Sequence, residues 1–198
     1  MILASQSPRR IELMREAGFD VRVIPADVDE TPRAGEPPFE LVERLATTKA
    51  EAVAAESAEP GELVLAADTI VAIDGEALGK PADETDARAM LRRLSGRTHQ
   101  VATGVCLLRA ACEGSEPGSP ERPATRDVFT VVTDVTFYDL ADAEIDAYVA
   151  TGEPTDKAGA YGIQGTGGRL LVRGINGDFY NVVGLPIAEV VRHMRLLN

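Results

Sequence analysis

ELVLAADTIVAI, at Glu62–Ile73, is the stretch on which the interpretation of the whole chain depends. Its nearly continuous apolar run is typical of a β-strand that is covered on both faces. Asp68 interrupts the run, and an ionised carboxylate there is unfavourable unless it is paired, hydrogen-bonded or bound to a metal. Asp68 is either a strand-end residue whose oxygens accept backbone N–H bonds, or a carboxylate held on rigid structure where a cleft opens. We adopt the second interpretation and search the chain for groups that face Asp68.

The composition is that of a soluble globular protein, with 44% apolar and 26% charged residues. A chain of 198 residues can bury a proper core, and we expect a single domain over residues 1–198. No apolar run reaches membrane-spanning length and the first residues lack the basic start of a signal peptide, so we expect no membrane contact. Cys106 and Cys112 lack metal-binding or framework spacing, which predicts free thiols in a reducing cytoplasm.

The net charge of −12 argues against a nucleic-acid partner, because such proteins need a basic surface. The cationic residues are 17 arginines and three lysines, Lys49, Lys80 and Lys157. An acidic, lysine-poor chain resembles an adaptation to high salt, although a merely acidic enzyme has the same composition. Because lysine is scarce, each of the three invites a functional explanation.

The N-terminal segment combines a short predicted strand, Ile2–Ala4, with the loop sequence SQSPRR. Ser7 can cap a helix over residues 8–18 that begins with proline and ends with glycine. Hydroxyl groups, exposed N–H groups and two arginines make such a junction a competent anion site. Arg9 and Arg10 lie in the first helical turn, where the helix dipole disfavours cations, so we expect an anion nearby.

The remaining chain alternates predicted strands and helices. Strands are expected at residues 19–23, 99–108, 128–138 and 179–183, helices at 39–57, 83–94, 142–150 and from 186 onward, and hairpin turns at 74–75 and 176–177. Residues 113–127 are rich in Pro, Gly and Ser and are interpreted as a mobile hairpin excursion. Lys49 falls on the apolar stripe of the 39–57 helix, where it either snorkels off the core edge or points a cation into the cleft.

Two glycine-containing stretches differ from known nucleotide-binding motifs. GEALGK resembles a P-loop, but its glycines are one residue too close and Pro81 stands where Ser or Thr would hold magnesium. GEPTDKAGAYGIQGTGG, at residues 152–168, contains Lys157 and Gln164 but no GxGxxG after a strand, so a dinucleotide-binding fold is not supported.

Ten residues are unusual for their surroundings or their type: Ser5, Arg9, Arg10, Glu30, Lys49, Asp68, Thr69, Lys80, Lys157 and Gln164. Two carboxylates among them suit a divalent cation with oxygen ligands. Several cations and a hydroxyl-bearing loop suit a polyphosphate, and gathering them at one place lets an anionic substrate approach an acidic chain. Residue types and spacing alone predict a phosphate-handling enzyme.

The sequence resembles the Maf family of nucleoside triphosphate pyrophosphatases along its whole length. The resemblance is carried, in chain order, by LASQSPRR (3–10), VDETPR (28–33), AADTIV (66–71), LGKP (78–81), SGRTHQVATGV (95–105), DKAGAYGIQG (156–165) and NVVGLP (181–186). It implies an α/β fold: a mixed, strongly bent sheet flanked by helices, with two lobes around a cleft, as in inosine triphosphatases. All three lysines fall inside these motifs or the helix between them.

The resemblance also implies the chemistry, which is hydrolysis between the α- and β-phosphates to a nucleoside monophosphate and pyrophosphate. Asp68 corresponds to the catalytic carboxylate that accepts a proton from the attacking water. Arg10, Glu30, Lys49 and Lys80 match the other active-site positions. Glu30 and Asp68 would hold the divalent cation, Mg²⁺ or Mn²⁺, and a homodimer is left open.

Base preference divides the family, and Arg9, Thr69 and Gln164 here resemble the set of the dTTP/UTP branch. A glutamine amide offers one donor and one acceptor, which matches the O4 acceptor and N3–H donor of uracil or thymine. Ser5 and Lys157 are taken as further substrate-binding residues. The implied role is house-cleaning of the nucleotide pool, including modified pyrimidine triphosphates.

Two other functions are less consistent with these residues. A nucleotide-binding regulator of cell division with weak catalysis would not need Asp68, Glu30 and Lys80 together. A purine-selective enzyme acting on inosine triphosphate is disfavoured by the residues at the base-selecting positions.

Overall fold

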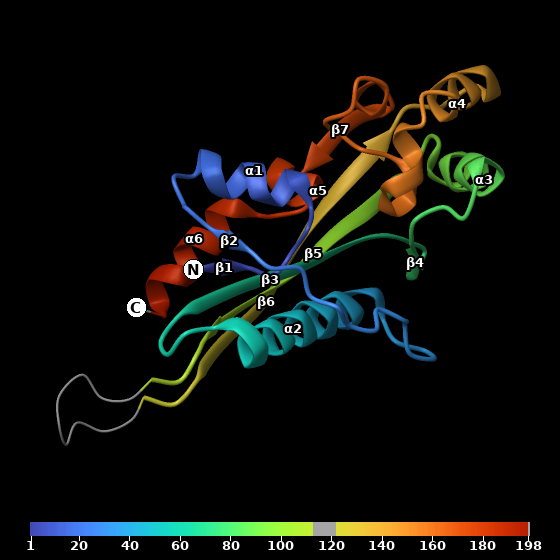
Figure 1. Ribbon diagram of the computed structural model, residues 1–198. Coiled ribbons are helices and arrows are strands. Elements are labelled where there is room, and N and C mark those ends of the chain that lie inside the picture. The colour runs from blue at the N-terminus through green and yellow to red at the C-terminus, as the bar shows by residue number, and fades with distance from the viewer. Residues whose placement is uncertain (113–121, 198) are drawn as a thin grey trace, which may run out of the picture.

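The computed structural model describes residues 1–112 and 122–197, and within them the centre of the molecule is a seven-stranded mixed sheet (Figure 1). Its order is β2-β1-β3-β5-β6-β7, with β4 paired to β3. β1 runs parallel to β2 and β3, and all other pairs are antiparallel. The strands are β1 (Ile2–Leu3), β2 (Arg22–Val23), β3 (Leu63–Ile73), β4 (Glu76–Leu78), β5 (Thr98–Arg109), β6 (Thr125–Phe137) and β7 (Val172–Asn176).

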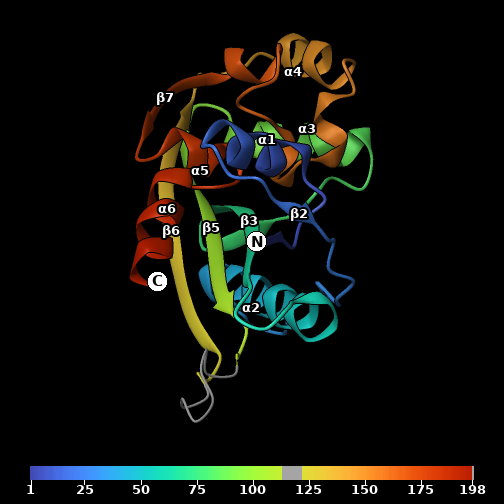
Figure 2. The ribbon, with the colours of Figure 1, turned by 60° about the vertical axis from the view of Figure 1, so that its left-hand side comes forward.

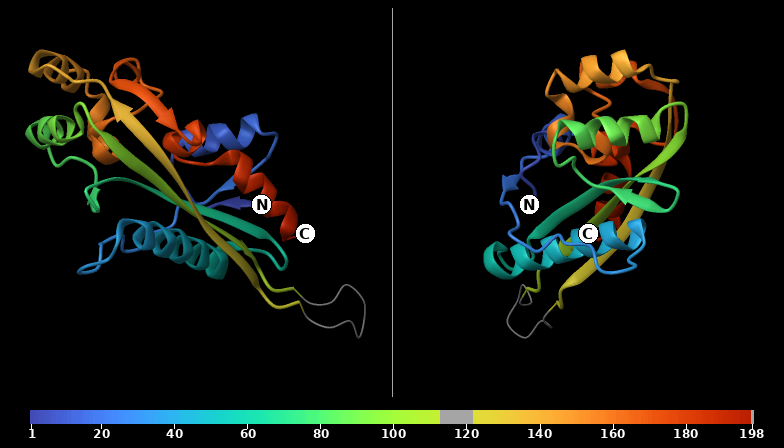
Figure 3. Two further views of the ribbon diagram at one scale, coloured as in Figure 1. Left: turned by 180° about the vertical axis from the view of Figure 1, so that it is seen from behind. Right: turned by 90° about the vertical axis from the view of Figure 1, so that its right-hand side faces the viewer.

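Helices cover both faces of this sheet, as the α/β expectation requires. They are α1 (Pro8–Glu16), α2 (Pro38–Ser57), α3 (Glu84–Leu94), α4 (Asp142–Val149), α5 (Phe179–Val183) and α6 (Ile187–Leu196), with short 3₁₀ turns at Glu153–Asp156, Ala158–Ala160 and Gly168–Leu170. Helix α2 lies on one side, and α1, α5 and α6 lie on the other (Figure 2). Helices α3 and α4 form a second lobe at the far end of the sheet (Figure 3). Among the described residues no helix is long and apolar enough to cross a bilayer.

Strand β3 is buried on both faces, which confirms the prediction from its apolar run. Its even-numbered residues Val64 and Ala66 pack toward α2, whereas Leu65 and Ala67 pack toward α1 and α6. The strand continues without a break through residues 68 and 69. Because side chains alternate along a strand, the Asp68 side chain projects toward α2 and the Thr69 side chain toward the opposite face.

One edge of β3 is shared by two short strands that do not meet. β1 pairs with β3 as far as Leu65, and β4 pairs with it from Val71 onward. Between them, residues 66–70 of β3 have no strand partner on that edge in the described part of the chain. We call residues 66–70 the open edge. Asp68 lies at the middle of the open edge. Because no strand covers β3 there, side chains on both faces of the sheet can be reached from this edge.

Helix α2 comes unusually close to the sheet beside Asp68. Gly104 of β5 is the cross-strand neighbour of Asp68 and lies under α2. A Cβ added at Gly104 would be 2.5 Å from the carbonyl carbon and oxygen of Val42, which is closer than side chains and backbone can pack. The absence of a side chain at this position therefore allows α2 to rest directly on β5.

Several predictions about elements were wrong or incomplete. Residues 179–183 form helix α5 instead of a strand, because Asp178 caps it through the Tyr180 N–H at 2.8 Å and Gly184 ends it. Residues 176–177 consequently lead into a helix and do not form a hairpin turn. The strand predicted at 19–23 is reduced to β2, and Ser7 at the start of α1 makes no side-chain cap bond. The segment predicted at 113–127 falls largely outside the described residues.

Candidate active site

Lys49 joins the two carboxylates that the sequence singled out. It lies on the sheet-facing stripe of α2 and is 8% exposed. Its Nζ donates to Oδ1 of Asp68 at 2.7 Å and pairs with Oε1 of Glu30 at 2.8 Å. The ammonium group thus points to the Asp68 carboxylate of the open edge and to the Glu30 carboxylate of the neighbouring loop, and not to bulk solvent. Among the described residues, the hydrogen bond to the Asp68 carboxylate is made to Oδ1, and none is made to Oδ2.

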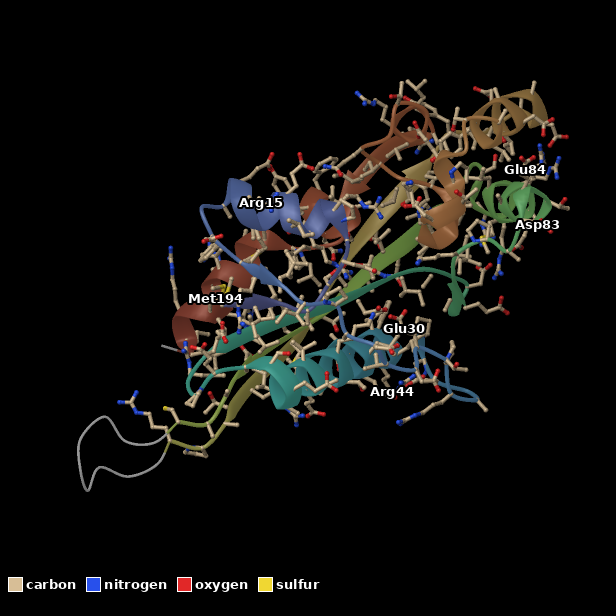
Figure 4. The ribbon with its side chains drawn as sticks, in the orientation of Figure 1. Arg15, Glu30, Arg44, Asp83, Glu84 and Met194 are labelled. Carbon is tan, nitrogen blue, oxygen red and sulfur yellow. The ribbon has the colours of Figure 1, made fainter. Side chains whose placement is uncertain are left out.

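The loop that carries Glu30 is held by the same helix. Arg44 of α2 forms a two-bond ion pair with Glu36 and donates to the carbonyl of Thr31 at 3.2 Å. This guanidinium lowers the pKa of Glu36 to about 2. Figure 4 shows Glu30 and Arg44 at the same end of α2. Helix α2 therefore supplies both the cation of the site and the anchor of the loop that brings Glu30 to it.

Arg10 occupies the other face of the open edge. Its Nε donates to the Gly184 carbonyl at 2.7 Å, and its Nη1 donates to the Ala67 carbonyl at 2.8 Å and to Ser5 Oγ at 3.4 Å. Its Nη2 donates to Thr69 Oγ1 at 3.0 Å. Burial lowers the pKa of Arg10, an effect that the nearby Asp68 carboxylate opposes. An arginine has five N–H groups, so one remains without an acceptor among the described residues.

The glycine-rich segment, residues 152–168, is bonded to α1 and to the loop between β4 and α3. Asp156 forms a long ion pair with Arg9 at 3.9 Å, and Lys157 is bonded to the Asp156 carboxylate and to the Glu153 carbonyl. The Gly159 N–H donates to the carbonyl of Gly79, the residue before Lys80. These contacts bring Arg9, Lys157 and the Lys80 loop to one end of the molecule.

Two of the predicted residues are exposed and have no side-chain bond among the described residues. Lys80 follows β4, and Gln164 lies in the glycine-rich segment. The backbone carbonyl of Gln164 accepts a hydrogen bond from Arg169 Nη2 at 3.1 Å, and its side-chain amide is left without a partner among the described residues. Both side chains are therefore available to a ligand, and neither has a position fixed by protein contacts.

The chemistry of the donor set fits a hard divalent cation. Asp68 and Glu30 converge on one point, now shared with the Lys49 ammonium, and both keep a second carboxylate oxygen. Mg²⁺ commonly binds through one or two carboxylates together with substrate phosphates and water. The described residues contain no cluster of three His, Cys, Asp or Glu that would form an all-protein cage. A metal at this site would thus be completed by the substrate.

Sequence reasoning missed four residues that shape the site: Arg44, Thr103, Asn181 and Gly184. Thr103 and Asn181 are fully buried polar residues. The signal for them was present, because polar side chains inside apolar stretches need partners. It could not identify those partners, which come from segments far apart in the chain.

Comparisons with known proteins show the family to which the chain belongs. A model of the family described as Maf-like protein matches residues 1–197. The chain is 52% identical to a dTTP/UTP pyrophosphatase of Anaeromyxobacter dehalogenans over 98% of its own length and 92% of the relative's, and 46% identical to one of Bacillus cereus over 100% and 95%. A solved Nucleoside-triphosphatase / dITP/XTP pyrophosphatase from Mycobacterium abscessus aligns over 99% and 95% of the two chains with 16% identity and a TM-score of 0.45. With the family model covering nearly every residue and half of the positions identical to named relatives, the chain belongs to the Maf family.

Proposed function

We propose that this protein hydrolyses dTTP and UTP to the nucleoside monophosphate and pyrophosphate. The observation that carries the proposal is the Asp68–Lys49–Glu30 group at the open edge of a Maf-family sheet. Relatives about half identical to the chain bear the name dTTP/UTP pyrophosphatase. The cellular role that follows is removal of unwanted pyrimidine triphosphates from the nucleotide pool.

The proposed role of Asp68 is to accept the proton of the attacking water. Oδ1 is occupied by the Lys49 ammonium, which leaves Oδ2 to accept a hydrogen bond from water. As the oxygen of that water bonds to phosphorus and the α–β anhydride bond breaks, its proton passes to the carboxylate. The hydrogen bond from Lys49 orients Asp68 for this step. Removal of such a general base costs roughly 10²–10⁴-fold in rate.

Cationic side chains around the open edge would bind the triphosphate. Arg10 contributes a fixed charge, and Lys80, Lys157 and Arg9 approach from the β4–α3 loop, the glycine-rich segment and α1. In a chain of net charge −12, this local group supplies the field that an anionic substrate needs. Asp68 and Glu30 would hold Mg²⁺ or Mn²⁺, which neutralises phosphate charge when bound.

Base selection is assigned to Gln164 and Arg9. The Gln164 amide is exposed and can present a donor and an acceptor to the edge of uracil or thymine. A site that hydrogen-bonds a substrate group discriminates strongly against analogues that lack it, because its own polar groups are then left unpaired.

The test is a panel of nucleoside triphosphates incubated with Mg²⁺ or Mn²⁺ and followed by pyrophosphate release and phosphorus NMR. The expected result is preferential turnover of dTTP and UTP with pyrophosphate as the first phosphorus product. Orthophosphate as the first product, or preferential turnover of a purine triphosphate, would refute the proposal. Folded Asp68→Asn protein is the negative control.

We also propose a homodimer in which a second copy covers the β7 edge. Among the described strands β7 pairs with β6 alone, and Ile175, Phe179 and Tyr180 close to it are 38–45% exposed. A free strand edge with apolar neighbours is a ready template for another chain. Light scattering should give a dimer mass for the native protein and a monomer mass for Ile175→Lys; a monomeric native protein would exclude this assembly.

The proposed compartment is the cytoplasm. Cys106 and Cys112 are both free, which is typical of proteins that work under reducing conditions. Burial raises the pKa of the Cys106 thiol to about 11, so this cysteine is a packed core residue and not a reactive one.

A further inference from the structure

The carboxylate of Glu153 accepts hydrogen bonds from three consecutive backbone N–H groups of residues 162–168, which we call the curl. Oε1 accepts from Thr166 at 2.9 Å and from Gly167 at 3.3 Å, and Oε2 accepts from Gly167 and Gly168, both at 3.3 Å. Successive N–H groups that converge in this way favour an anion, and hydrogen bonds to a charged acceptor are stronger than those between neutral groups. A single side chain therefore holds three residues of the curl at once.

Glycines let the curl close tightly around this carboxylate. A Cβ added at Gly165 would be 2.2 Å from Glu153 Oε2, and the φ of Gly165 is not positive, so glycine is needed here for the close approach and not for the backbone conformation. The ring of Tyr148 fills the adjacent space, because a Cβ added at Gly167 would be 2.5 Å from its Cδ2. The Tyr148 hydroxyl also accepts from the Gly162 N–H at 3.2 Å. The curl is thus packed around two side chains, Glu153 and Tyr148.

Gln164 lies in the middle of the curl, and its backbone is held on both sides. Arg169 donates to the Gln164 carbonyl at 3.1 Å and to the Gly165 carbonyl at 2.9 Å. Arg169 directly follows Gly168, whose N–H is bonded to Glu153, so the carboxylate also anchors the start of this second clasp. The side-chain amide of Gln164 has no partner among the described residues, and its place is therefore set by the backbone that carries it.

From these contacts we infer that Glu153 is a positioning residue for base selection, because it sets where the Gln164 amide can meet the base. This inference rests on the proposed function, and it adds to the base-selecting residues one whose own oxygens are already occupied by the protein. Loosening the curl should weaken binding of the preferred pyrimidine. Asp68 and Lys49, which act on phosphate groups shared by all nucleoside triphosphates, keep their places at the open edge.

The experiment compares Glu153→Gln with a matched control, Glu144→Gln. Glu144 also accepts a backbone N–H, from Ala141 at 2.8 Å, but it lies in the first turn of α4 and makes no bond to the curl among the described residues. Glutamine retains the shape of glutamate, yet its NH₂ group replaces an acceptor with a donor that faces backbone N–H groups. A second variant, Gly165→Ala, keeps the carboxylate and disturbs the same contact from the other side.

For each variant, kcat and KM are measured for dTTP and dGTP. Glu153→Gln should lower the dTTP-to-dGTP ratio of kcat/KM about 10-fold, mainly through a higher KM for dTTP, since hydrogen bonds to a charged group are lost. Gly165→Ala should shift the ratio in the same direction, and Glu144→Gln should match the native protein. Independently of activity, NMR of ¹⁵N-labelled protein should show faster amide hydrogen exchange at Thr166, Gly167 and Gly168 in Glu153→Gln but not in Glu144→Gln.

An unchanged ratio in folded Glu153→Gln protein would overturn the inference, even with faster exchange, because Glu153 would then hold the curl without any part in base selection. Equal losses of kcat for both nucleotides would also overturn it, since they would place Glu153 in the chemical step. If Glu153→Gln does not fold, the ratio in Gly165→Ala decides. A native protein that hydrolyses no nucleoside triphosphate would instead refute the proposed function, and the exchange rates would still decide whether Glu153 holds the curl.

Discussion

Replacing Gly104 by alanine should displace α2 and disturb the Lys49–Asp68 pair without touching either residue. A Cβ at this position would lie 2.5 Å from Val42 backbone atoms, whereas ordinary contact begins at 3.4 Å. The helix or the strand must therefore withdraw by about 0.9 Å, the difference between these two distances. The obstacle is helix backbone, which cannot rotate away as a side chain can, so the displacement extends along α2 toward Lys49.

The expected magnitude follows from this displacement. Overpacking of a core typically costs about 1–3 kcal/mol, and each kcal/mol lowers the melting temperature of a domain of this size by about 2–4 °C. We therefore expect Gly104→Ala to melt roughly 2–12 °C below the native protein. Misplacing a catalytic group by about 1 Å can reduce activity as much as 10²-fold, so kcat/KM should fall by one to two orders of magnitude even in folded protein.

Thermal denaturation and pyrophosphate release, the latter measured well below the melting transition, separate the two effects. Gly174→Ala is the matched control: Gly174 also lies in a strand, its φ is not positive, and an added Cβ would meet nothing within 4 Å. This control should keep native stability and activity. If Gly104→Ala is as stable and as active as Gly174→Ala, the close contact between α2 and β5 does not set the geometry of the site.

Four further predictions test individual groups. Asp68→Asn should lose about 10²–10⁴-fold in turnover with an unchanged circular dichroism spectrum, and near-native turnover would remove Asp68 from the mechanism. Lys49→Met keeps the apolar stem but leaves Asp68 unpaired, so activity should fall at least about 10²-fold while the free energy of unfolding falls by about 1–3 kcal/mol. Kinetics and urea titration measure the two effects, and a loss of stability with nearly native activity would make Lys49 a structural residue. Gln164→Glu should lower the ratio of kcat/KM for dTTP over dGTP, because a carboxylate cannot donate to O4 or O2, and an unchanged ratio would exclude Gln164 from base selection. Burial lowers the pKa of His99 to about 4 in the folded protein, whereas its pKa in the unfolded chain is near 6.5. Between these two pH values the unfolded chain binds a proton that the folded protein does not, so the free energy of unfolding should fall by about 3 kcal/mol from pH 6.5 to pH 4. Urea titration at both pH values should show this loss, and a smaller one in His99→Gln.

Periodicity in the sequence predicted the central elements of this fold correctly. The apolar run around Asp68 is β3, the stripe containing Lys49 faces the sheet, and Asp83 caps α3 through the Asp86 N–H at 2.8 Å. These features depend on residues close together in the chain. Local pattern is sufficient where the partner of a residue lies within one or two turns.

Prediction failed where distant segments decide the conformation. Phe179–Val183 has strand-forming residues, yet it is helical: besides the Asp178 cap, the Asn181 side chain donates to the Val101 carbonyl and to the Thr133 hydroxyl, both at 3.0 Å, and holds the segment against β5 and β6. Tertiary contacts of this kind override local propensity. The same limit applies to the site, since the sequence predicted an anion near Arg10 but did not indicate that the backbone carbonyl of Gly184 would accept from its guanidinium at 2.7 Å.

The bonds from Arg10 to Gly184 and from Thr103 to Asn181 connect residues 174 and 78 positions apart in the chain. Such long-range closures form late in folding, because the entropy of closing a large loop must be overcome before the contact stabilises anything. During synthesis the ribosome makes the α5 segment long after β1, α1 and β3. Until it arrives, Arg10 lacks its shortest hydrogen bond and Thr103 lacks its carbonyl partner. The α5 segment therefore completes the site, so a chain that ends before it can contain every acidic and lysine residue of the site and still be unable to hold its arginine.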